Sequence, residues 1–247
     1  MIDIHSHILP GIDDGAADIY DTLKMAKMAV ESGVTQIVAT PHCNIPGGYE
    51  NYFGERYINA YERAVEAIQK EGLLLQILPG MEVFGTYNLP DLIVDKKIMP
   101  LNQSRYILIE FDFNEDPAYV MDILKRTQEV GAIPIVAHAE RYKFIQERPE
   151  IALEWVANGF AIQVNKGSFT GRFGEAERRA AYILLENDLA AAVASDAHSA
   201  KVRTPFMLDA YEELKKHYSE DKLNVVFYEN PKRICNNEPI IRIESVE

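Results

Sequence analysis

Cysteine is scarce in this chain: among 247 residues only Cys43 and Cys235 are cysteines, and they lie far apart in the sequence. Two such residues do not build the disulfide framework of a small secreted protein, so we expect a reducing cytoplasm. Apolar runs are short as well, and none approaches the roughly 20 residues that a membrane-spanning helix needs. We therefore expect no stable membrane insertion. The first residues lack a basic stretch followed by an apolar one, which predicts no secretory signal.

Basic residues are outnumbered, with 25 Lys and Arg against 38 Asp and Glu and a formal net charge of −13. Nucleic acids bind through clustered Lys and Arg, so the charge balance argues against a nucleic-acid partner. The acidity has two readings that stay open: an ordinary solvated surface, or carboxylates that serve as metal ligands. Hydrophobic residues make up 47% of the chain, and no low-complexity segment or long linker interrupts it. We expect a single domain over residues 1–247.

Short β-branched or apolar runs alternate along the chain with longer segments of helical period, the pattern of βα units. The predicted strands are 2–5, 36–40, 75–82, 106–110, 133–138, 161–164 and 191–195, and the predicted helices are 19–32, 55–70, 118–130, 151–158, 175–187 and 205–217. Glycines 33, 72, 131 and 159 follow helical segments, as helix-ending glycines do. We predict an α/β fold, a distorted seven-stranded (β/α) barrel of parallel strands with outer helices. An open doubly wound sheet is the alternative.

Polar side chains stand at the carboxyl end of almost every predicted strand. They are His5, His7, His42, Glu82, Glu110, His138, Asp196 and His198. These ends converge on one face of a parallel barrel, where active sites form. Five of the six histidines are thus predicted to meet, and only His217 lies outside the cluster.

Any one of these residues could be an ordinary hydrogen-bonded side chain at a strand end. Gathered at one barrel mouth, several imidazoles and carboxylates would repel or desolvate one another, and bound cations remove that penalty. Alternate residues of a strand point to the same side, so His5 and His7 can reach one ion. A nitrogen and oxygen ligand set without thiolate suits Mn, Fe or Zn. Cys43 follows His42 but points away from it, and we interpret it as a packing residue.

The ordered motifs H-x-H, T-P-H, G-x-E, I-E-F, H-x-E-R and S-D-x-H resemble the polymerase and histidinol phosphatase (PHP) superfamily of metallohydrolases. Four longer segments resemble one branch of this superfamily: "MIDIHSHILPGIDDGA", "RYILIEF", "PIVAHAERY" and "VASDAH". That branch contains the manganese-dependent protein-tyrosine phosphatases of capsular and exopolysaccharide biosynthesis loci in Gram-positive bacteria. The resemblance runs from Ile2 to about Pro231.

The resemblance implies a PHP-type barrel that holds three divalent metal ions, with Mn²⁺ preferred and Fe or Zn as alternatives. The implied ligands are His5, His7 and Asp196 for the first ion, Glu82 as the bridge to a second, Glu110 and His138 for that second ion, and Asp14, His42 and His198 for the third. Asp13 stands beside Asp14, and the sequence leaves open which of the two is the ligand. Arg141 is the implied contact to the substrate phosphate, with Arg203 as a second candidate.

The activity implied by the resemblance is hydrolysis of phosphotyrosine by metal-activated hydroxide. The implied partner is a bacterial tyrosine kinase that controls capsule or exopolysaccharide synthesis. A small-molecule phosphomonoesterase, such as a histidinol-phosphate phosphatase, shares the site and is the alternative. A nuclease-like domain and a non-catalytic metal-binding protein are further alternatives, and the acidic charge and the complete ligand set disfavour them. The sequence does not fix the oligomeric state.

A thiolate mechanism can be examined in the sequence. Cysteine-dependent tyrosine phosphatases place an Arg six residues after the reactive Cys. Here Tyr49 follows Cys43 at that distance and Ile241 follows Cys235. Neither cysteine has the partner that would bind phosphate, so we predict that neither is a nucleophile.

Overall fold

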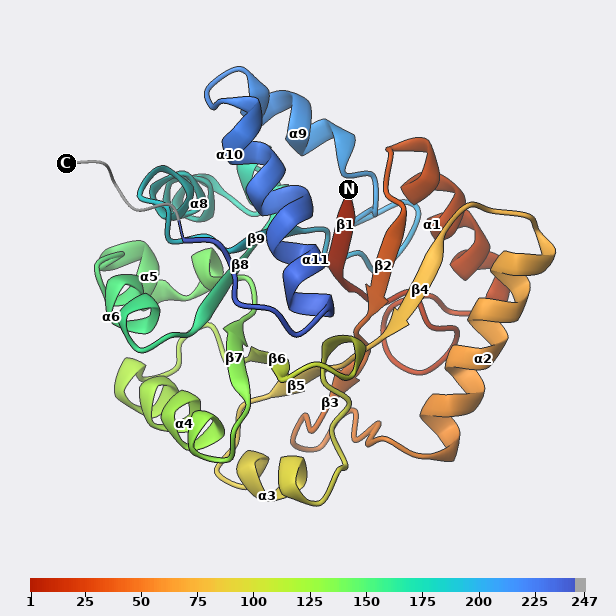
Figure 1. Ribbon diagram of the computed structural model, residues 1–247, viewed down its shortest axis with the longest axis horizontal. Helices are drawn as coiled ribbons and strands as arrows, with labels where there is room; N and C mark the ends of the chain where they lie inside the picture. The colour runs from red at the N-terminus through yellow and green to blue at the C-terminus, as the bar shows by residue number, and fades with distance from the viewer. Residues whose placement is uncertain (243–247) are drawn as a thin grey trace.

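Parallel β-strands form the centre of the molecule, with helices around them (Figure 1). The computed structural model describes residues 1–242, so residues 243–247 of the predicted domain lie outside the described residues. The strands in the described part are β1 (Ile2–Ser6), β2 (Gln36–Ala39), β3 (His42–Cys43), β4 (Gln76–Pro79), β5 (Glu82–Phe84), β6 (Tyr106–Glu110), β7 (Ile133–Val136), β8 (Ala161–Asn165) and β9 (Ala192–Ala194). They form one sheet in the order β1-β2-β4 and another in the order β3-β5-β6-β7-β8-β9, and every strand pair is parallel.

The predicted α/β class with parallel strands is confirmed, but the count of seven continuous strands is not. The predicted strand 75–82 is divided into β4 and β5, and β3 follows β2 after a two-residue gap. Pro41, between β2 and β3, has no N–H to give to a sheet. Gly80 stands between β4 and β5, where an added Cβ would lie 2.6 Å from Val38 Cγ1. The register survives the break, since Ala39 pairs with Pro79 and His42 with Glu82.

The two sheets curl so that β1 lies beside the segment that follows β9. Ser6 forms a parallel bridge with Ala197, and the N–H of Asp196 donates to the carbonyl oxygen of His5 at 2.8 Å. Asp3, which is fully buried, accepts from Ser195 Oγ at 2.5 Å and from the Ser195 N–H at 2.9 Å. Neighbouring strands follow chain order throughout, so the order does not reverse as it would in the doubly wound alternative.

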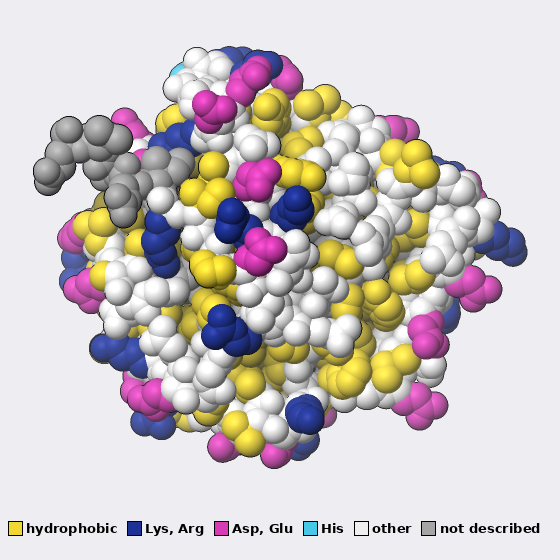
Figure 2. Space-filling view, in the orientation of Figure 1, with side chains coloured by type: hydrophobic (Ala, Val, Ile, Leu, Met, Phe, Trp, Pro, Cys, Tyr) yellow, Lys and Arg dark blue, Asp and Glu magenta, His cyan; other side chains and the backbone are white. Residues whose placement is uncertain are grey.

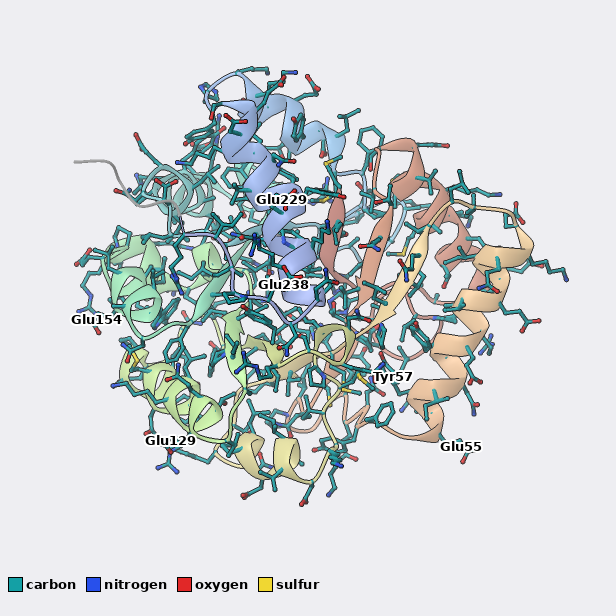
Figure 3. All side chains as sticks on the ribbon, in the orientation of Figure 1. Glu55, Tyr57, Glu129, Glu154, Glu229 and Glu238 are labelled. Atoms are coloured by element: carbon teal, nitrogen blue, oxygen red, sulfur yellow. The ribbon has the colours of Figure 1, made fainter. Side chains whose placement is uncertain are left out.

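The helices of the described residues are α1 (Ile19–Glu31), α2 (Glu55–Lys70), α3 (Leu89–Val94), α4 (Pro117–Glu129), α5 (Lys143–Glu147), α6 (Ile151–Ala157), α7 (Lys166–Phe169), α8 (Glu175–Glu186), α9 (Leu208–Lys215), α10 (Glu220–Asn224) and α11 (Asn230–Cys235). All six predicted helices are present, α2 with the predicted bounds. Their amphipathic pattern determines which side packs on the strands: Tyr57 of α2 points inward, where its hydroxyl donates to the Gly80 carbonyl oxygen at 3.0 Å, while Glu55 points outward (Figure 3). Glu129 and Glu154 also point away from the strands. None of these helices is long and apolar enough to cross a bilayer.

Two buried apolar clusters hold the layers together. The larger one lies between the strands and the surrounding helices and includes Met25, Ile109, Leu124 and Leu184. The smaller cluster joins strand side chains to Ile234 of α11, which crosses the strands in the view of Figure 1. On the face in Figure 2, Lys and Arg are interspersed with Asp, Glu and apolar surface, and hardly any histidine is visible. The charge pattern of this face gives no broad basic surface for nucleic acid.

Candidate metal centre

The structure brings all the predicted ligands together at the carboxyl ends of the strands. Three groups have ligand atoms within 4.8 Å of one another: His5, His7 and Asp196; His42, Glu82 and Glu110; and His7, Asp14, His42 and His198. His7 and His42 each belong to two groups, so the three groups form one continuous cluster. His138 lies in none of them, but its Nε2 is 3.0 Å from Glu82 Oε1 and 3.8 Å from Glu110 Oε2.

A buried chain of hydrogen bonds fixes the first of these groups. His5 Nδ1 lies 3.0 Å from Gln163 Oε1, Gln163 Nε2 donates to Asn165 Oδ1 at 2.9 Å, and Asn165 Nδ2 donates to Asp196 Oδ2 at 2.7 Å. Gln163 Oε1 also accepts the N–H of His138 at 2.9 Å. Such outer hydrogen bonds determine which ring nitrogen of a histidine is free to bind a metal. Here they leave Nε2 of His5 facing the cluster, 3.3 Å from Nε2 of His7.

Asp13 and Asp14 have separate positions. The side chain of Asp13 is buried behind the cluster: its Oδ2 lies 2.8 Å from His7 Nδ1 and accepts the N–H of His42 at 3.0 Å. Asp14 is half exposed, and its Oδ1 lies 3.4 Å from His42 Nε2 and 3.5 Å from His198 Nε2. The geometry therefore favours Asp14 as the ligand and Asp13 as the residue that orients His7.

Glu82 occupies the centre of the cluster. Its Oε1 is 3.1 Å from His5 Nε2, and its Oε2 is 3.2 Å from His7 Nε2 and 3.0 Å from His42 Nδ1. The two oxygens of this one carboxylate therefore face different imidazoles.

Unpartnered atoms test whether these residues fit a metal. Six buried atoms in the cluster have no hydrogen-bond partner among the described residues: His42 Nδ1, Glu82 Oε2, Glu110 Oε1, His138 Nδ1, Asp196 Oδ1 and His198 Nε2. His42 Nδ1 and Glu110 Oε1 approach to 2.7 Å without hydrogen-bond geometry. Buried polar atoms are normally paired, because an unpaired one costs about 1–3 kcal/mol. The donor set therefore fits divalent cations, which accept several such lone pairs at once.

The electrostatics of the cluster favour positive charge. Burial disfavours charged His42, but the Glu82 and Glu110 carboxylates outweigh burial and raise the pKa of His42 to about 10. Burial would raise the pKa of Glu82, but the imidazoles of His5 and His42 hold it well below its usual range. The pKa of Asp196 is likewise lowered, against burial, by His5, His7 and Arg203. Several carboxylates thus stay ionised in a buried place, where protons or cations must balance them.

The backbone turns sharply at two of the predicted ligands. His138 has φ 35° just after β7, and Asp196 has φ 50° just after β9. Residues other than glycine seldom adopt this left-handed region, and such strain is concentrated at functional sites. Strand periodicity alone does not predict either turn.

The two predicted phosphate contacts differ in their surroundings. Arg141 has Nη1 3.9 Å from Asp196 Oδ2, and its guanidinium lies against the rings of Phe113 and Phe173. Arg203 is held more tightly, with Nη2 in contact with Asp196 Oδ1 and Nε donating to the Asp196 carbonyl oxygen at 3.2 Å.

The cysteines take no part in the cluster. Both are free and buried, and burial raises the pKa of each thiol to about 12. Cys43 donates to the carbonyl oxygen of Glu50 at 3.1 Å. The prediction that Cys43 is a packing residue is confirmed. Gln163 was not predicted as a site residue, although it stands two residues before Asn165 on β8, the same alternation that relates His5 and His7.

The parallel α/β fold and the cluster of imidazoles and carboxylates define a metal-binding protein of the hydrolase type. The chain matches the family model described as "Capsular polysaccharide synthesis, CpsB/CapC" over residues 1–236. It belongs to the CpsB/CapC family.

Curated relatives and solved structures agree with this family. The chain is 36% identical over 242 residues to the tyrosine-protein phosphatase YwqE of Bacillus subtilis, covering 98% of this chain and 94% of the relative. It is 31% identical over 243 residues to the tyrosine-protein phosphatase CpsB of Streptococcus agalactiae, covering 96% and 99%.

A chain from the crystal structures of YwqE from Bacillus subtilis and CpsB from Streptococcus pneumoniae, described as metal-dependent tyrosine phosphatases, superposes with a TM-score of 0.90. It is 37% identical in sequence, and the match covers 98% of this chain and 97% of that one. A histidinol phosphate phosphatase from Lactococcus lactis superposes at a TM-score of 0.56 with 14% identity, covering 87% and 92%, which shows a shared fold only.

Proposed function

We propose that this chain is a metal-dependent protein-tyrosine phosphatase that hydrolyses phosphotyrosine on a bacterial tyrosine kinase controlling capsule or exopolysaccharide synthesis. The observation that carries the proposal is the convergence of buried ligand atoms without hydrogen-bond partners near Arg141, whose guanidinium makes no hydrogen bond within residues 1–242. Its relatives named as tyrosine-protein phosphatases support the substrate class. The residue set also supports a cytoplasmic location, since both cysteines are free.

We assign the metal ligands as nine residues: His5, His7, Asp14, His42, Glu82, Glu110, His138, Asp196 and His198. The three observed groups support a site for three divalent ions, and the ligand types suit Mn, Fe or Zn. Among these, the family resemblance implies Mn²⁺. Divalent ions bound there would supply positive charge and Lewis acidity, which lowers the pKa of water and offsets phosphoryl charge. We propose that residues 1–247 form one domain. The nine strands correspond to a distorted seven-stranded barrel if β2 with β3, and β4 with β5, each count as one strand, because the register continues across both breaks.

The protein's own part in the reaction is positioning and charge. Arg141 directs N–H donors toward the place of the phosphoryl group, and phosphoryl transfer depends chiefly on such placement and charge neutralisation. Glu82 and Asp196, whose pKa values are lowered, supply negative charge to the cluster. Gln163 fixes the orientation of the His5 ring, and Asn165 that of the Asp196 carboxylate. With both thiols protonated and buried, no cysteine serves as nucleophile.

Turnover of three substrates tests the proposal: a phosphotyrosyl peptide, histidinol phosphate and a single-stranded oligonucleotide. We expect hydrolysis of the peptide, loss of activity after chelation, and recovery when Mn²⁺ is returned. His7→Ala should lose activity by at least a hundredfold, whereas the control His217→Ala, which changes the one histidine outside the cluster, should keep it. Preference for histidinol phosphate would establish the alternative, and fewer than two bound ions with full activity would contradict the three-ion site.

A further inference from the structure

Arg141 and Arg203, the two arginines at the candidate site, are held in place by different contacts. The Cζ of Arg141 lies 4.1 Å from the centre of the Phe113 ring and 4.6 Å from the centre of the Phe173 ring. Within residues 1–242 its guanidinium makes no hydrogen bond, and its nearest carboxylate oxygen, Oδ2 of Asp196, is 3.9 Å away. Arg203 contacts the same Asp196 directly. Arg141 is therefore located by aromatic packing, and its N–H donors are uncommitted.

Two rings constrain a guanidinium in a specific way. The five N–H donors of arginine lie in the plane of the group, so packing against aromatic rings leaves those donors available at its edge. An edge with two parallel N–H groups matches two phosphate oxygens. Each cation–π contact attracts the guanidinium to the ring and restricts a side chain that otherwise has many rotamers. The aromatic packing thus orients the guanidinium of Arg141 before an anion binds.

The two rings come from different parts of the fold. Phe113 follows β6, its carbonyl oxygen accepts the N–H of Lys143 at 2.9 Å, and its ring centre lies 5.5 Å from that of His138. Phe113 therefore contacts both a proposed metal ligand and Arg141. Both rings are half-buried, and that of Phe113 also packs against the larger apolar cluster.

Phe173 belongs to the short segment Gly-Arg-Phe-Gly at residues 171–174, just before α8. The glycines on either side have φ +76° and +132°, values that other residues rarely adopt. The ring is packed over Gly167, where an added Cβ would lie 3.0 Å from Phe173 Cε2. The local sequence therefore turns the chain so that Phe173 reaches back to Arg141.

We propose that Phe113 and Phe173 are positioning residues that hold the Arg141 guanidinium with its donor edge toward the phosphoryl group of the substrate. This inference rests on the proposed phosphatase function and adds to it two residues that no metal-ligand pattern identifies. Ordinary apolar packing is the competing explanation, and it predicts an effect of the two rings that does not depend on Arg141.

A double-mutant cycle separates the two explanations. Phe173→Leu should lower kcat/KM for a phosphotyrosyl peptide about tenfold, and Phe113→Leu should act similarly. In an Arg141→Ala background, Phe173→Leu should change kcat/KM less than twofold, because the group it positions is gone. Phe173→Tyr should restore activity to within about twofold of wild type. The control Tyr228→Leu removes a cation–π pair with Lys232 on the C-terminal helices and should have no effect.

A second readout is independent of turnover. Calorimetry of inorganic phosphate with the metal-loaded protein should show about tenfold weaker binding in Phe173→Leu, with the number of bound ions unchanged. A wild type that binds phosphate but does not hydrolyse phosphotyrosine would refute the proposed function, while the same loss of phosphate affinity would still support the positioning role. An equal loss of kcat/KM in the presence and absence of Arg141, or unchanged phosphate affinity, would overturn the inference.

Discussion

Gln163→Leu tests whether the buried hydrogen-bond chain controls the metal site. The variant keeps a similar volume but leaves three groups without a partner: Nδ1 of His5, the N–H of His138 and Oδ1 of Asn165. At about 1 kcal/mol for each buried group, the metal-free protein should lose about 3 kcal/mol of unfolding free energy. Because His5 is no longer oriented, Mn²⁺ affinity should fall about 10- to 100-fold.

Two measurements on the same preparations check this prediction. Urea unfolding in the presence of a chelator gives the free energy of unfolding, and competition with a chelating dye gives the Mn²⁺ affinity. The control Gln128→Leu removes one exposed hydrogen bond, to the Asn158 carbonyl oxygen, and should change neither quantity appreciably. A Gln163→Leu protein that is less stable but binds Mn²⁺ within twofold of wild type would refute the reasoning, because Gln163 would then be a structural residue only.

Three further predictions address other groups. Cys43→Ser should keep activity on a phosphotyrosyl peptide within about twofold, because a thiol with a pKa of about 12 is protonated at neutral pH; a large loss would revive a thiolate mechanism. Burial raises the pKa of Glu140 from 4.5 to about 7, so the wild type should lose about 3 kcal/mol relative to Glu140→Gln as the pH rises from about 4.5 past 7. Chelated samples unfolded in urea at pH 4.5 and 8 measure this difference, and parallel pH profiles would contradict it. Asp3→Ala should lower the unfolding free energy by about 2 kcal/mol, since it leaves the N–H of Ser195 without its acceptor and the Ser195 hydroxyl with only the His5 carbonyl oxygen at 3.2 Å; urea unfolding checks this, and a loss under 1 kcal/mol would count against the contact.

Much of the fold follows from periodicity. The bounds of α2 and β6 are those predicted, because a long amphipathic repeat and a run of β-branched residues are strong local signals. The short helices α3, α5, α7, α10 and α11 were not predicted, since four to six residues are too few to show a helical period. The division of β4 from β5 falls at Gly80, where an added Cβ would lie 2.6 Å from Val38, and a local pattern cannot show a close approach to a residue so distant in sequence.

The site was predictable in a similar measure. The residue types at strand ends, together with the convergence of those ends, bring His5, His42, Glu82 and the other predicted ligands to one place. The separate roles of Asp13 and Asp14 could not be predicted from the sequence, because they depend on which of the two carboxylates turns inward to His7. The rings of Phe113 and Phe173 were not accessible either, because no local pattern marks an aromatic residue that packs on an arginine from another loop.

The bridge between Ser6 and Ala197 has a consequence for how the protein matures. The first proposed ligand, His5, comes from the opening strand, and the last, His198, follows the final strand. During synthesis the N-terminal ligands therefore leave the ribosome long before their partners exist. At the proposed site, the ligands of β1 cannot be completed until the segment that carries Asp196 and His198 has been made and has paired with β1. A chain that stops before Asp196 would carry His5 and His7 but not the complete set of proposed ligands.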